Sequence, residues 1–516
     1  MRTIKFSFLL TLSFLLGSYT NSADLNAGEH IKLRYLSHYP SGELKGSAEI
    51  VSFDHASQLA FVTNGLARSI DAISLAKPEL PFLEFRINIK PFGFPNSVAV
   101  KNDLVAVAVA NNNPQANGWI VIFNTKGEYL NKFSAGPMPD MVTFSPNAKY
   151  VLSANEGEPN DAYDIDPEGS ITIVDLVDDV RKLTQKNVRT ADFKVFTRAS
   201  LDPWVRIIDN NASVAQDLEP EHISISADSK TAWVSLQENN ALAQVSLEFG
   251  RVKKIIGLGT LSHNTKSTAI DASDKDNGIN IKAWPVEGLF QPDSIATFNV
   301  ANDVYIVTAN EGDARNYSGF SEVVRVKDLA LDGALFSNIQ NTDQLGRLKV
   351  STIEADPDGN GLADKLVSFG TRSFSIWNAD GYRVYDSGSE FARITARDHP
   401  DLFNANDTRS DDKGSEPEAL AIGRVGNSLY AFIGLERTGG IMVYNITQPE
   451  EAFFVDYINN FSPRLSPEAS YTGDRGPESI VFVSAKNSPN GTPFIITGNE
   501  ISGTVSVYQI LDRASP

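Results

Sequence analysis

The stretch from Gly414 to Asn459, GSEPEALAIGRVGNSLYAFIGLERTGGIMVYNITQPEEAFFVDYIN, contains four short runs that predict one small antiparallel sheet. The runs are rich in β-branched and aromatic residues and are bounded by Gly, Pro, Asn or Ser, which is typical of a meander. They are Glu418–Ile422, Leu429–Leu435, Ile441–Ile446 and Ala452–Ile458. A single sheet of this size cannot bury both of its faces, so it requires neighbouring sheets.

Similar pairs of runs recur along the chain, spaced by roughly 45 residues where no long loop intervenes, which is the length of a propeller blade. The second runs of the expected units are Gln58–Thr63, Leu104–Ala110, Tyr150–Ala154, Thr231–Leu236, Val304–Ala309, Lys365–Gly370, Leu429–Leu435 and Pro493–Gly498. The third runs are Ser69–Leu75, Gly118–Phe123, Gly169–Leu176, Ala241–Leu247, Glu322–Val326, Ser373–Trp377, Gly440–Ile446 and Gly503–Ile510.

The sequence therefore predicts an all-β fold, a β-propeller of four-stranded blades that forms a single domain over residues 31–512. The eight pairs predict eight blades. Seven is the alternative, because Leu348–Thr352 could be the fourth strand of the fifth blade or the first strand of the sixth. An open ring would expose a sheet edge, so we expect the N-terminal run Ile31–His38 to join the last blade and close the ring.

Composition and charge exclude several classes of function. The 516 residues include no Cys, which excludes disulfides, thiolate catalysis and Cys-ligated metal sites. The formal net charge of −19 makes nucleic acid or an anionic membrane an unfavourable partner. An acidic excess suits cation binding, although it also serves solubility.

The N-terminus resembles an export signal. Arg2 and Lys5 precede the apolar run Phe6–Leu16, which is too short to span a bilayer, and small residues follow near position 22. We therefore expect residues 1–22 to be a signal peptide. The sequence shows no transmembrane span, and we expect a secreted, periplasmic or extracellular monomer.

Acidic residues recur at two positions of the expected blades. The first strands open with Pro95-Asn96, Pro139-Asp140, Pro220-Glu221, Pro292-Asp293, Pro417-Glu418 and Pro477-Glu478, and Ala48-Glu49 is a weaker copy. The second strands end in Asn155-Glu156, Gln237-Glu238, Asn310-Glu311, Leu435-Glu436 and Asn499-Glu500. In an antiparallel pair, the start of one strand and the end of the next lie at the same edge, so both sets should converge on one face near the axis.

Such a concentration of carboxylates requires protonation, Arg partners or metal ions. We expect calcium, which suits oxygen-only ligands, with Glu156, Glu221, Asp293, Glu311, Glu418 and Glu478 as candidate metal ligands. Arg315, Arg372 and Arg437 follow second strands on the same face, and with Glu436 and Glu500 they are candidate ligand-binding residues. The alternative is that each acid only stabilises a turn within its own blade.

One loop matches the first nine positions of a calcium-binding loop. Asp356, Asp358 and Asn360 stand at positions one, three and five, Gly361 stands at position six, and Asp364 stands at position nine. The Glu expected at position twelve is replaced by Val367. We predict a calcium site here, with an ordinary Asx-rich turn as the alternative.

Several segments resemble one protein family. They are residues 153–159, 271–278, 307–315, 369–377, 409–418 and 431–440. Together they resemble the secreted choice-of-anchor I domain, whose animal relatives are described as mesenchyme-specific cell-surface glycoproteins and some of whose bacterial members are named alkaline phosphatase. The resemblance covers nearly the whole chain after the signal and implies an extracellular β-propeller.

Three functions are consistent with these observations. The first is a secreted, calcium-binding propeller whose acidic face binds a small molecule, a phosphoester or an extracellular matrix or surface ligand. The second is a metal-dependent phosphatase, in which the acids hold metal ions and Arg315, Arg372 and Arg437 bind phosphate. The third is a structural scaffold. We find no nucleophile elbow, phosphate-binding glycine loop or H-E-x-x-H motif.

Overall fold

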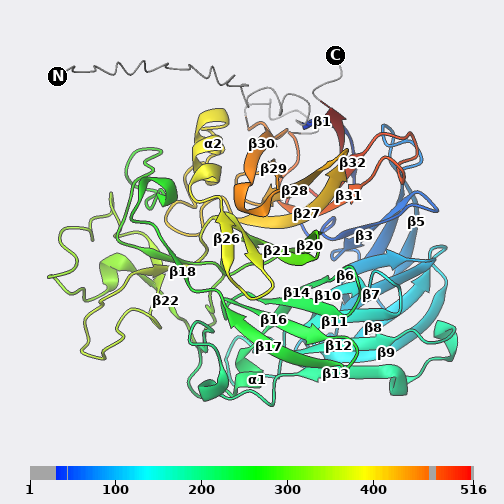
Figure 1. The fold of residues 1–516 in the computed structure, drawn as a ribbon, viewed down its shortest axis with the longest axis horizontal. Helices are drawn as coiled ribbons and strands as arrows, with labels where there is room; N and C mark the ends of the chain where they lie inside the picture. Colours follow the sequence, from blue (N-terminus) through cyan, green and yellow to red (C-terminus); the bar gives the residue numbers. More distant parts are fainter. Residues whose placement is uncertain (1–30, 43–44, 464–471, 513–516) are drawn as a thin grey trace, which may run out of the picture.

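The computed structural model describes residues 31–42, 45–463 and 472–512 (Figure 1). The expected signal peptide, residues 1–22, lies outside the described residues. Strands dominate the described chain, and the two α-helices, α1 (Val214–Asp217) and α2 (Glu390–Asp398), are short. The fold is all-β, as the sequence predicts.

Seven four-stranded antiparallel sheets form the body of the described chain. Five of them use consecutive strands, and the first two of these are β2 (Val51–Asp54), β3 (Leu59–Asn64), β4 (Ser69–Ser74) and β5 (Phe82–Asn88), and then β6 (Phe94–Lys101), β7 (Leu104–Ala110), β8 (Asn117–Asn124) and β9 (Tyr129–Pro137). The next two are β10 (Pro139–Phe144), β11 (Tyr150–Asn155), β12 (Ser170–Asp175) and β13 (Val188–Asp192), and then β14 (Pro220–Ile225), β15 (Thr231–Leu236), β16 (Ala241–Ser246) and β17 (Arg251–Gly257). The fifth consists of β27 (Pro417–Val425), β28 (Ser428–Leu435), β29 (Ile441–Asn445) and β30 (Phe453–Ile458). The last of these is the sheet predicted from residues 414–459.

The remaining two sheets join distant segments. One consists of β20 (Ile295–Val300), β21 (Asp303–Asn310), β25 (Ser373–Asn378) and β26 (Arg383–Asp386). The other has the order β1 (Ile31–Pro40), β33 (Thr504–Asp512), β32 (Phe494–Asn499) and β31 (Pro477–Val483). Pairing of Ile31 with Asp512 and of Pro40 with Thr504 confirms that the N-terminal strand joins the last sheet.

The sheets are packed face to face in a propeller-like arrangement (Figure 1). The first strands, β2, β6, β10, β14, β20, β27 and β31, each contact the next in this order, and β31 contacts β2. Between each pair of neighbouring sheets lies one apolar core, for example Val107 and Val121 against Phe61 and Ile70. Another core joins the last sheet to the first, with Ile496 and Val507 packed near Val62. Burial between sheets therefore stabilises the ring.

One expected pairing is wrong. The run Val304–Ala309 does not pair with Glu322–Val326, because β21 pairs with β25 across a long insertion. The expected runs Lys365–Gly370 and Ser373–Trp377 therefore belong to different sheets: the first contains β24 (Val367–Ser368), which pairs in parallel with β19 (Glu287–Leu289). The fifth and sixth expected units thus contribute one four-stranded sheet. Sequence periodicity cannot distinguish a blade strand from a short strand of an insertion.

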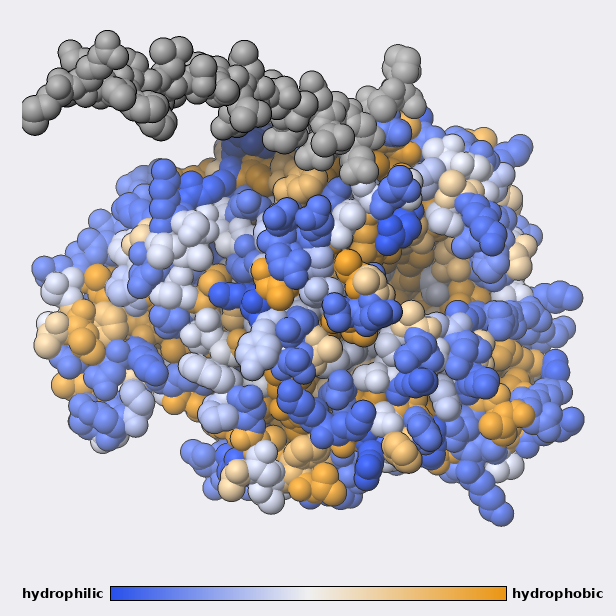
Figure 2. All heavy atoms as spheres, in the orientation of Figure 1, coloured by the Kyte–Doolittle hydropathy of each residue, from blue (hydrophilic) through white to orange (hydrophobic). Residues whose placement is uncertain are grey.

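Two small sheets, formed by the insertion together with residues 260–289, lie at the left of Figure 1. In one sheet β18 (Thr260–Ser262) pairs with β19 and β19 with β24, and in the other β22 (Val323–Arg325) pairs with β23 (Lys349–Ser351). Leu348–Thr352 therefore lies in the insertion. Short 3₁₀ turns occur at Val180–Lys182, Gln185–Asn187, Arg198–Ser200, Lys266–Thr268, Val326–Asp328 and Pro449–Glu451. On the face shown in Figure 2, hydrophilic residues predominate and apolar residues occur in separate small groups.

Candidate functional site

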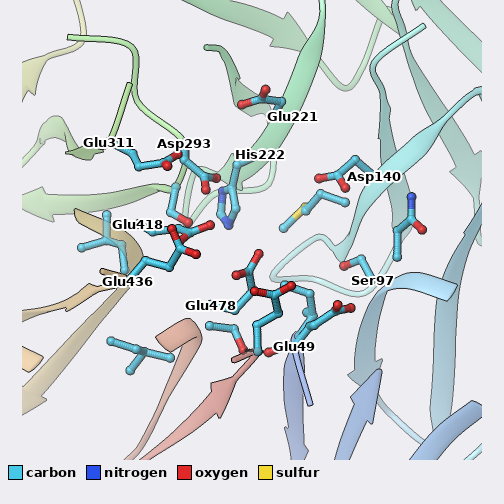
Figure 3. Close-up of a pocket in the computed structure, with 18 of the residues that line it drawn as sticks. Glu49, Ser97, Asp140, Glu221, His222, Asp293, Glu311, Glu418, Glu436 and Glu478 are labelled. Atoms are coloured by element: carbon cyan, nitrogen blue, oxygen red, sulfur yellow. Dashed lines mark hydrogen bonds between the residues drawn. The ribbon is translucent and has the colours of Figure 1, made fainter. Parts of the chain in front are cut away.

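A cavity of about 800 Å³ lies where the seven first strands meet. Its wall carries eleven carboxylates and few cations, and Figure 3 shows ten of the lining residues labelled around a common space. The carboxylates are Glu49, Asp140, Glu156, Glu221, Asp293, Glu311, Asp313, Glu418, Glu436, Glu478 and Glu500. We call this cavity the acidic pocket.

The local backbone explains why the first-strand acids face the acidic pocket. Five first strands have a register shift just after their Pro, as between Pro139 and Val142 or Pro417 and Leu420. A β-bulge leaves the residue that follows the Pro outside the hydrogen-bonded ladder and changes the direction of its side chain. The residue before the Pro has a left-handed backbone at Met138 (φ 46°) and Glu416 (φ 52°), so the chain bends sharply as it enters the strand.

The second-strand motif divides into a structural residue and a pocket residue. Asn155 is buried, and its amide donates to the Ser170 carbonyl and hydroxyl and to the Thr172 hydroxyl. Asn310 donates to Ser373 and Ser375 in the same way. The following residues, Glu156 and Glu311, line the acidic pocket. The Asn therefore ties the second strand to the third, and the acid that follows it is left for the pocket.

One side of the acidic pocket has little positive charge to balance its carboxylates, because within the described residues the cation that lines this side is Lys45, whose side chain is 66% exposed. Burial, followed by repulsion from neighbouring carboxylates, raises the pKa of Asp293, Glu418 and Glu478 well above the usual range. The same causes raise the pKa of Glu221 and Glu156. They raise the pKa of Asp140 to about 6 and that of Glu49 to about 7. Glu221 Oε2 and Glu418 Oε2 are buried and have no hydrogen-bond partner within the described residues.

On the other side basic residues balance part of the charge, although burial still raises the pKa values of Glu311 and Glu436. Lys413 Nζ lies 2.6 Å from Glu311 Oε1, and Arg437 Nη1 lies 2.8 Å from Glu436 Oε1. Glu416 is buried behind them and accepts from Arg409 at 2.6 Å and from Arg437 at 3.1 Å. These pairs fix the position of the carboxylates. They also place two positive groups, Lys413 and Arg437, on the wall of the acidic pocket.

His222 is the imidazole of the acidic pocket (Figure 3). Burial lowers its pKa to about 4, so the ring is neutral at physiological pH. Its Nδ1 lies 3.4 Å from the Ile295 backbone nitrogen and accepts from it, which assigns the ring proton to Nε2. His222 therefore contributes a neutral donor and does not compensate the carboxylates.

Two groups of carboxylates in the acidic pocket are close enough to share a metal ion. One oxygen from each of Asp293, Glu311 and Glu418 lies within 4.8 Å of the others, and the same holds for Glu311, Glu416 and Glu436. The first group fits a cation better, because Glu418 Oε2 is unpartnered while Glu416 is already bound by two arginines. An all-oxygen donor set suits a hard divalent cation such as Ca²⁺.

Comparison with known proteins identifies the family. A family model for the choice-of-anchor I domain matches residues 49–449, which contain six of the seven first strands. The chain belongs to the choice-of-anchor I domain family.

Two relatives of this choice-of-anchor I domain carry names. Gigasin-3a from Magallana gigas is 30% identical over 197 residues, covering 35% of this chain and 69% of that protein. The mesenchyme-specific cell surface glycoprotein from Strongylocentrotus purpuratus is 27% identical over 348 residues, covering 58% of this chain. The match spans 41% of the Strongylocentrotus protein, less than half of its length.

Among solved structures, hydrazine synthase from Kuenenia stuttgartiensis resembles this choice-of-anchor I domain with a TM-score of 0.46 and 12% identity. That match covers 92% of this chain and 97% of the other. None of the helices formed by the described residues has the length and apolar character needed to cross a bilayer.

In this choice-of-anchor I domain, most of the predicted site residues gather in the acidic pocket. These are Glu156, Glu221, Asp293, Glu311, Glu418, Glu478, Glu436, Glu500 and Arg437. The prediction of site residues omitted Asp140, Glu49, Asp313 and Lys413, which also line the pocket, and Glu416 behind it. Asp140 and Glu49 carry the same first-strand signal and could have been included. Lys413 and Glu416 lie in an irregular segment, so no repeat marks them.

Arg315 and Arg372 do not line the acidic pocket. Arg315 is fully buried, with Nη2 3.0 Å from Glu219 Oε1 and Nη1 3.6 Å from Asp217 Oδ2. Arg372 donates to the backbone carbonyls of Asp271, Ser410 and Asp412. The expectation that both arginines face the same space as Arg437 is wrong. Each turns away to hold loops together, because a buried guanidinium needs several acceptors.

The predicted calcium loop lies apart from the acidic pocket. Oxygens of Asp356, Asp358 and Asp364 lie within 4.8 Å of one another. Asp356 accepts from the backbone N–H groups of Gly359, Asn360 and Gly361 at 2.8 to 3.1 Å, which lowers its pKa. The geometry accommodates both alternatives left by the sequence, a calcium loop and an Asx-rich turn.

Proposed function

We propose that this chain is an extracellular or cell-surface, seven-bladed β-propeller whose acidic pocket binds calcium and, through it, an anionic group of a small molecule or surface partner. Family membership and the name of the Strongylocentrotus relative, a cell surface glycoprotein, support the location. The seven four-stranded sheets and the ring of contacts between their first strands support the blade count.

The observation that carries the proposal is the group Asp293, Glu311 and Glu418. Three carboxylate oxygens, one from each residue, lie within 4.8 Å of one another. The Glu418 side chain keeps an oxygen without a hydrogen-bond partner, and the nearby carboxylate of Glu478 repels it. Burying such a group costs several kcal/mol unless protons or a cation neutralise it. A divalent cation offsets this cost at neutral pH without loss of the carboxylate charges.

Calcium is the cation that the surroundings favour. The ligands are carboxylates, Cys is absent from the chain, and His222 presents its protonated nitrogen. Zinc and copper prefer nitrogen and sulfur donors, whereas calcium takes six to eight oxygens in irregular geometry. Extracellular modules operate with dissociation constants of roughly 10⁻⁴ to 10⁻³ M, so a moderate site is sufficient outside the cell.

Calorimetry with calcium on the wild type and on Glu418→Gln tests the proposal. We expect the substitution to weaken binding by about tenfold or more, because one charged ligand is lost from a small set. Asp343→Asn is the matched control, since Asp343 is exposed and lies in the insertion. If the wild type takes up no calcium at millimolar concentration, or if both variants bind alike, the acidic pocket is not a calcium site.

The loop at Asp356, Asp358 and Asp364 is proposed as a second, independent calcium site. Its oxygens form a group of the required size, although Val367 stands where a calcium loop normally has Glu. Asp358→Asn should remove one class of sites in the same titration while leaving the Glu418-dependent class unchanged. Unaltered stoichiometry and affinity in this variant would leave the loop as an Asx-rich turn.

Phosphoester hydrolysis remains the second candidate, favoured by Lys413 and Arg437 beside the possible metal ligands. A cation and two fixed positive groups could hold a phosphate and activate water. Release of p-nitrophenol from its phosphate ester in calcium, by wild type, Arg437→Ala and Glu418→Gln, distinguishes the candidates. Loss of a measurable activity in both variants supports the enzyme, whereas equal rates in all three proteins reject it.

A further inference from the structure

A second cavity, of about 680 Å³, opens between the sheet β14–β17 and the insertion. It shares no lining residue with the acidic pocket. Residues of β18, β19 and β24 form part of its lining, including Thr260, Glu287 and Val367. The loop 203–206 contributes another part, and Phe336 and Glu354 come from the insertion. We call this cavity the Trp204 cleft.

Trp204 is an exposed aromatic side chain in this cleft. Its residue is 59% exposed, although indole rings are normally well buried in folded proteins. The backbone N–H of Trp204 donates to Asp202 Oδ1 at 2.9 Å, which fixes the turn. A Cβ at Gly257 would lie 2.3 Å from the Trp204 carbonyl carbon, and one at Gly259 would lie 3.7 Å from the ring. Gly257 therefore lets the loop lie close against the end of β17, while a Cβ at Gly259 would make an ordinary contact with the ring.

The carboxylates of the Trp204 cleft are held in place. Glu354 Oε1 accepts from Arg206 Nε at 2.7 Å, and Arg206 also pairs with the buried Glu322. Glu287 Oε2 accepts from the Thr260 hydroxyl at 3.1 Å. The lining contains Glu287, Glu354 and Asp364 against Arg206 and Lys365, so positive and negative groups nearly balance. The cleft thus offers fixed hydrogen-bond acceptors without a strong charge.

We propose that the Trp204 cleft binds a neutral oligosaccharide, with one pyranose ring stacked on the exposed face of Trp204. The C–H face of a sugar ring is apolar and flat, so it covers an indole well, while its hydroxyls donate to fixed carboxylates such as Glu287 and Glu354. A free ionic ligand is disfavoured because the local charges balance. An acidic glycan is disfavoured further by the net charge of −19.

Affinity electrophoresis in gels that contain laminarin, galactomannan or xylan tests this binding, and an alginate gel provides the acidic comparison. We expect at least one neutral polysaccharide to retard the wild-type protein. Trp204→Ala should raise the dissociation constant about tenfold or more, and Trp204→Phe should retain part of the retardation because its ring still stacks. Phe249→Ala is the control, since Phe249 is 62% exposed but does not line the cleft.

A fluorescence titration with the retarding polysaccharide gives a second readout. An exposed indole that becomes covered should shift its emission to shorter wavelength, and the shift should vanish in Trp204→Phe. The proposal is overturned if no neutral gel retards the wild type, if alginate alone does so, or if Trp204→Ala is retarded like the wild type. None of these results depends on calcium binding at Glu418, so the two proposals fail separately.

Discussion

Two groups of buried carboxylates interact electrostatically in this chain and differ in what balances their charge. Asp217 and Glu219 lie against the guanidinium of Arg315, which has no exposed surface on its side chain. Burial raises the pKa of Glu219 as well as those of Glu418 and Asp293 in the acidic pocket, but Glu418 and Asp293 have no salt bridge within the described residues. Glu219 and Glu156 nevertheless repel each other, so the two groups of carboxylates are electrostatically coupled.

The difference separates acids that brace the fold from acids that are available to a ligand. A carboxylate with a fixed Arg partner has its charge balanced by that partner before any ligand arrives. A buried carboxylate without such a partner raises the free energy of the empty protein, and a cation can recover that energy. The predictions below test whether the acids sort in this way, and they run from the largest expected change in stability to the smallest.

Arg315→Met should destabilise the protein most, by about 3–5 kcal/mol, because Asp217 and Glu219 would keep buried charges without their cation. Denaturant unfolding followed by far-UV circular dichroism measures the change. The double variant with Glu219→Gln should recover part of the loss, since one of the stranded charges is then removed. A loss below about 1 kcal/mol would mean that this pair resembles an exposed ion pair and does not brace the fold.

Asn499→Ala should cost about 2–3 kcal/mol, although its neighbour Glu500 lines the acidic pocket. The Asn499 amide donates to the Thr504 carbonyl at 3.0 Å and to the Ser506 hydroxyl at 3.1 Å, joining β32 to β33. These acceptors would remain buried without a donor. Thermal unfolding measures the effect, and calcium affinity should stay unchanged. A variant with normal stability and weaker calcium binding would place Asn499 among the ligand residues.

The blades could be predicted from the sequence wherever strand, turn and spacing agree. The sheet β27–β30 begins and ends within three residues of the expected runs, because Pro417, Gly426 and Pro449 interrupt the apolar runs clearly. The region between β21 and β25 could not be predicted. There the insertion contains short strands whose composition equals that of blade strands, and only their partners reveal the difference.

The acidic pocket was predictable in position but not in its charge balance. The Pro-acid and Asn-acid repeats identify Glu418 and Glu311 because each strand end carries the same signal. No comparable repeat in the sequence indicates the direction in which an Arg side chain points. Arg315 and Arg437 both follow an acid near a strand end, yet Arg315 turns to Glu219 and Arg437 turns to the pocket. Tertiary contacts from distant segments decide between these directions.

Between pH 6.5 and 8, the stability of the calcium-free protein should fall by at least about 2 kcal/mol. Burial, together with neighbouring charges, raises the pKa of Glu49, Glu238 and Glu436 to about 7. In this window the unfolded chain has already lost these protons, while the folded protein loses them as pH rises, so stability decreases. The buried histidines, with pKa values of about 4, are neutral in the folded protein, whereas unfolded His, with a pKa of about 6.5, loses its remaining protons in this window, so they offset part of the fall.

Denaturant titrations at four pH values in this window, with chelator and with calcium, check the slope. Calcium should flatten it, because the ion binds the deprotonated carboxylates and replaces the protons. Glu49→Gln should reduce the fall by about 0.8 kcal/mol, the share of one carboxyl whose pKa lies near 7. Stability that rises with pH in chelator would show that cations compensate these carboxylates in the folded protein, as Arg206 does for Glu354, whose pKa is lowered despite its burial.

Glu500→Gln should have the smallest effect, within about 0.5 kcal/mol of the wild type, and so provides the sharpest contrast with Asn499→Ala one residue earlier. The Glu500 side chain is 17% exposed, and its cation partner is Lys45 at 3.6 Å, whose own side chain is 66% exposed. Such a pair contributes little to stability.

Glu500 belongs to neither group of pocket carboxylates that could share a metal ion, so calcium affinity should fall less than threefold, compared with tenfold or more for Glu418→Gln. Thermal unfolding and calorimetry on the same three proteins give both numbers. If Glu500→Gln destabilised the fold as strongly as Asn499→Ala, the acids of the Asn-Glu motif would stabilise the fold as the Asn residues do. The distinction between structural and ligand-binding residues would then not hold for the neighbours Asn499 and Glu500.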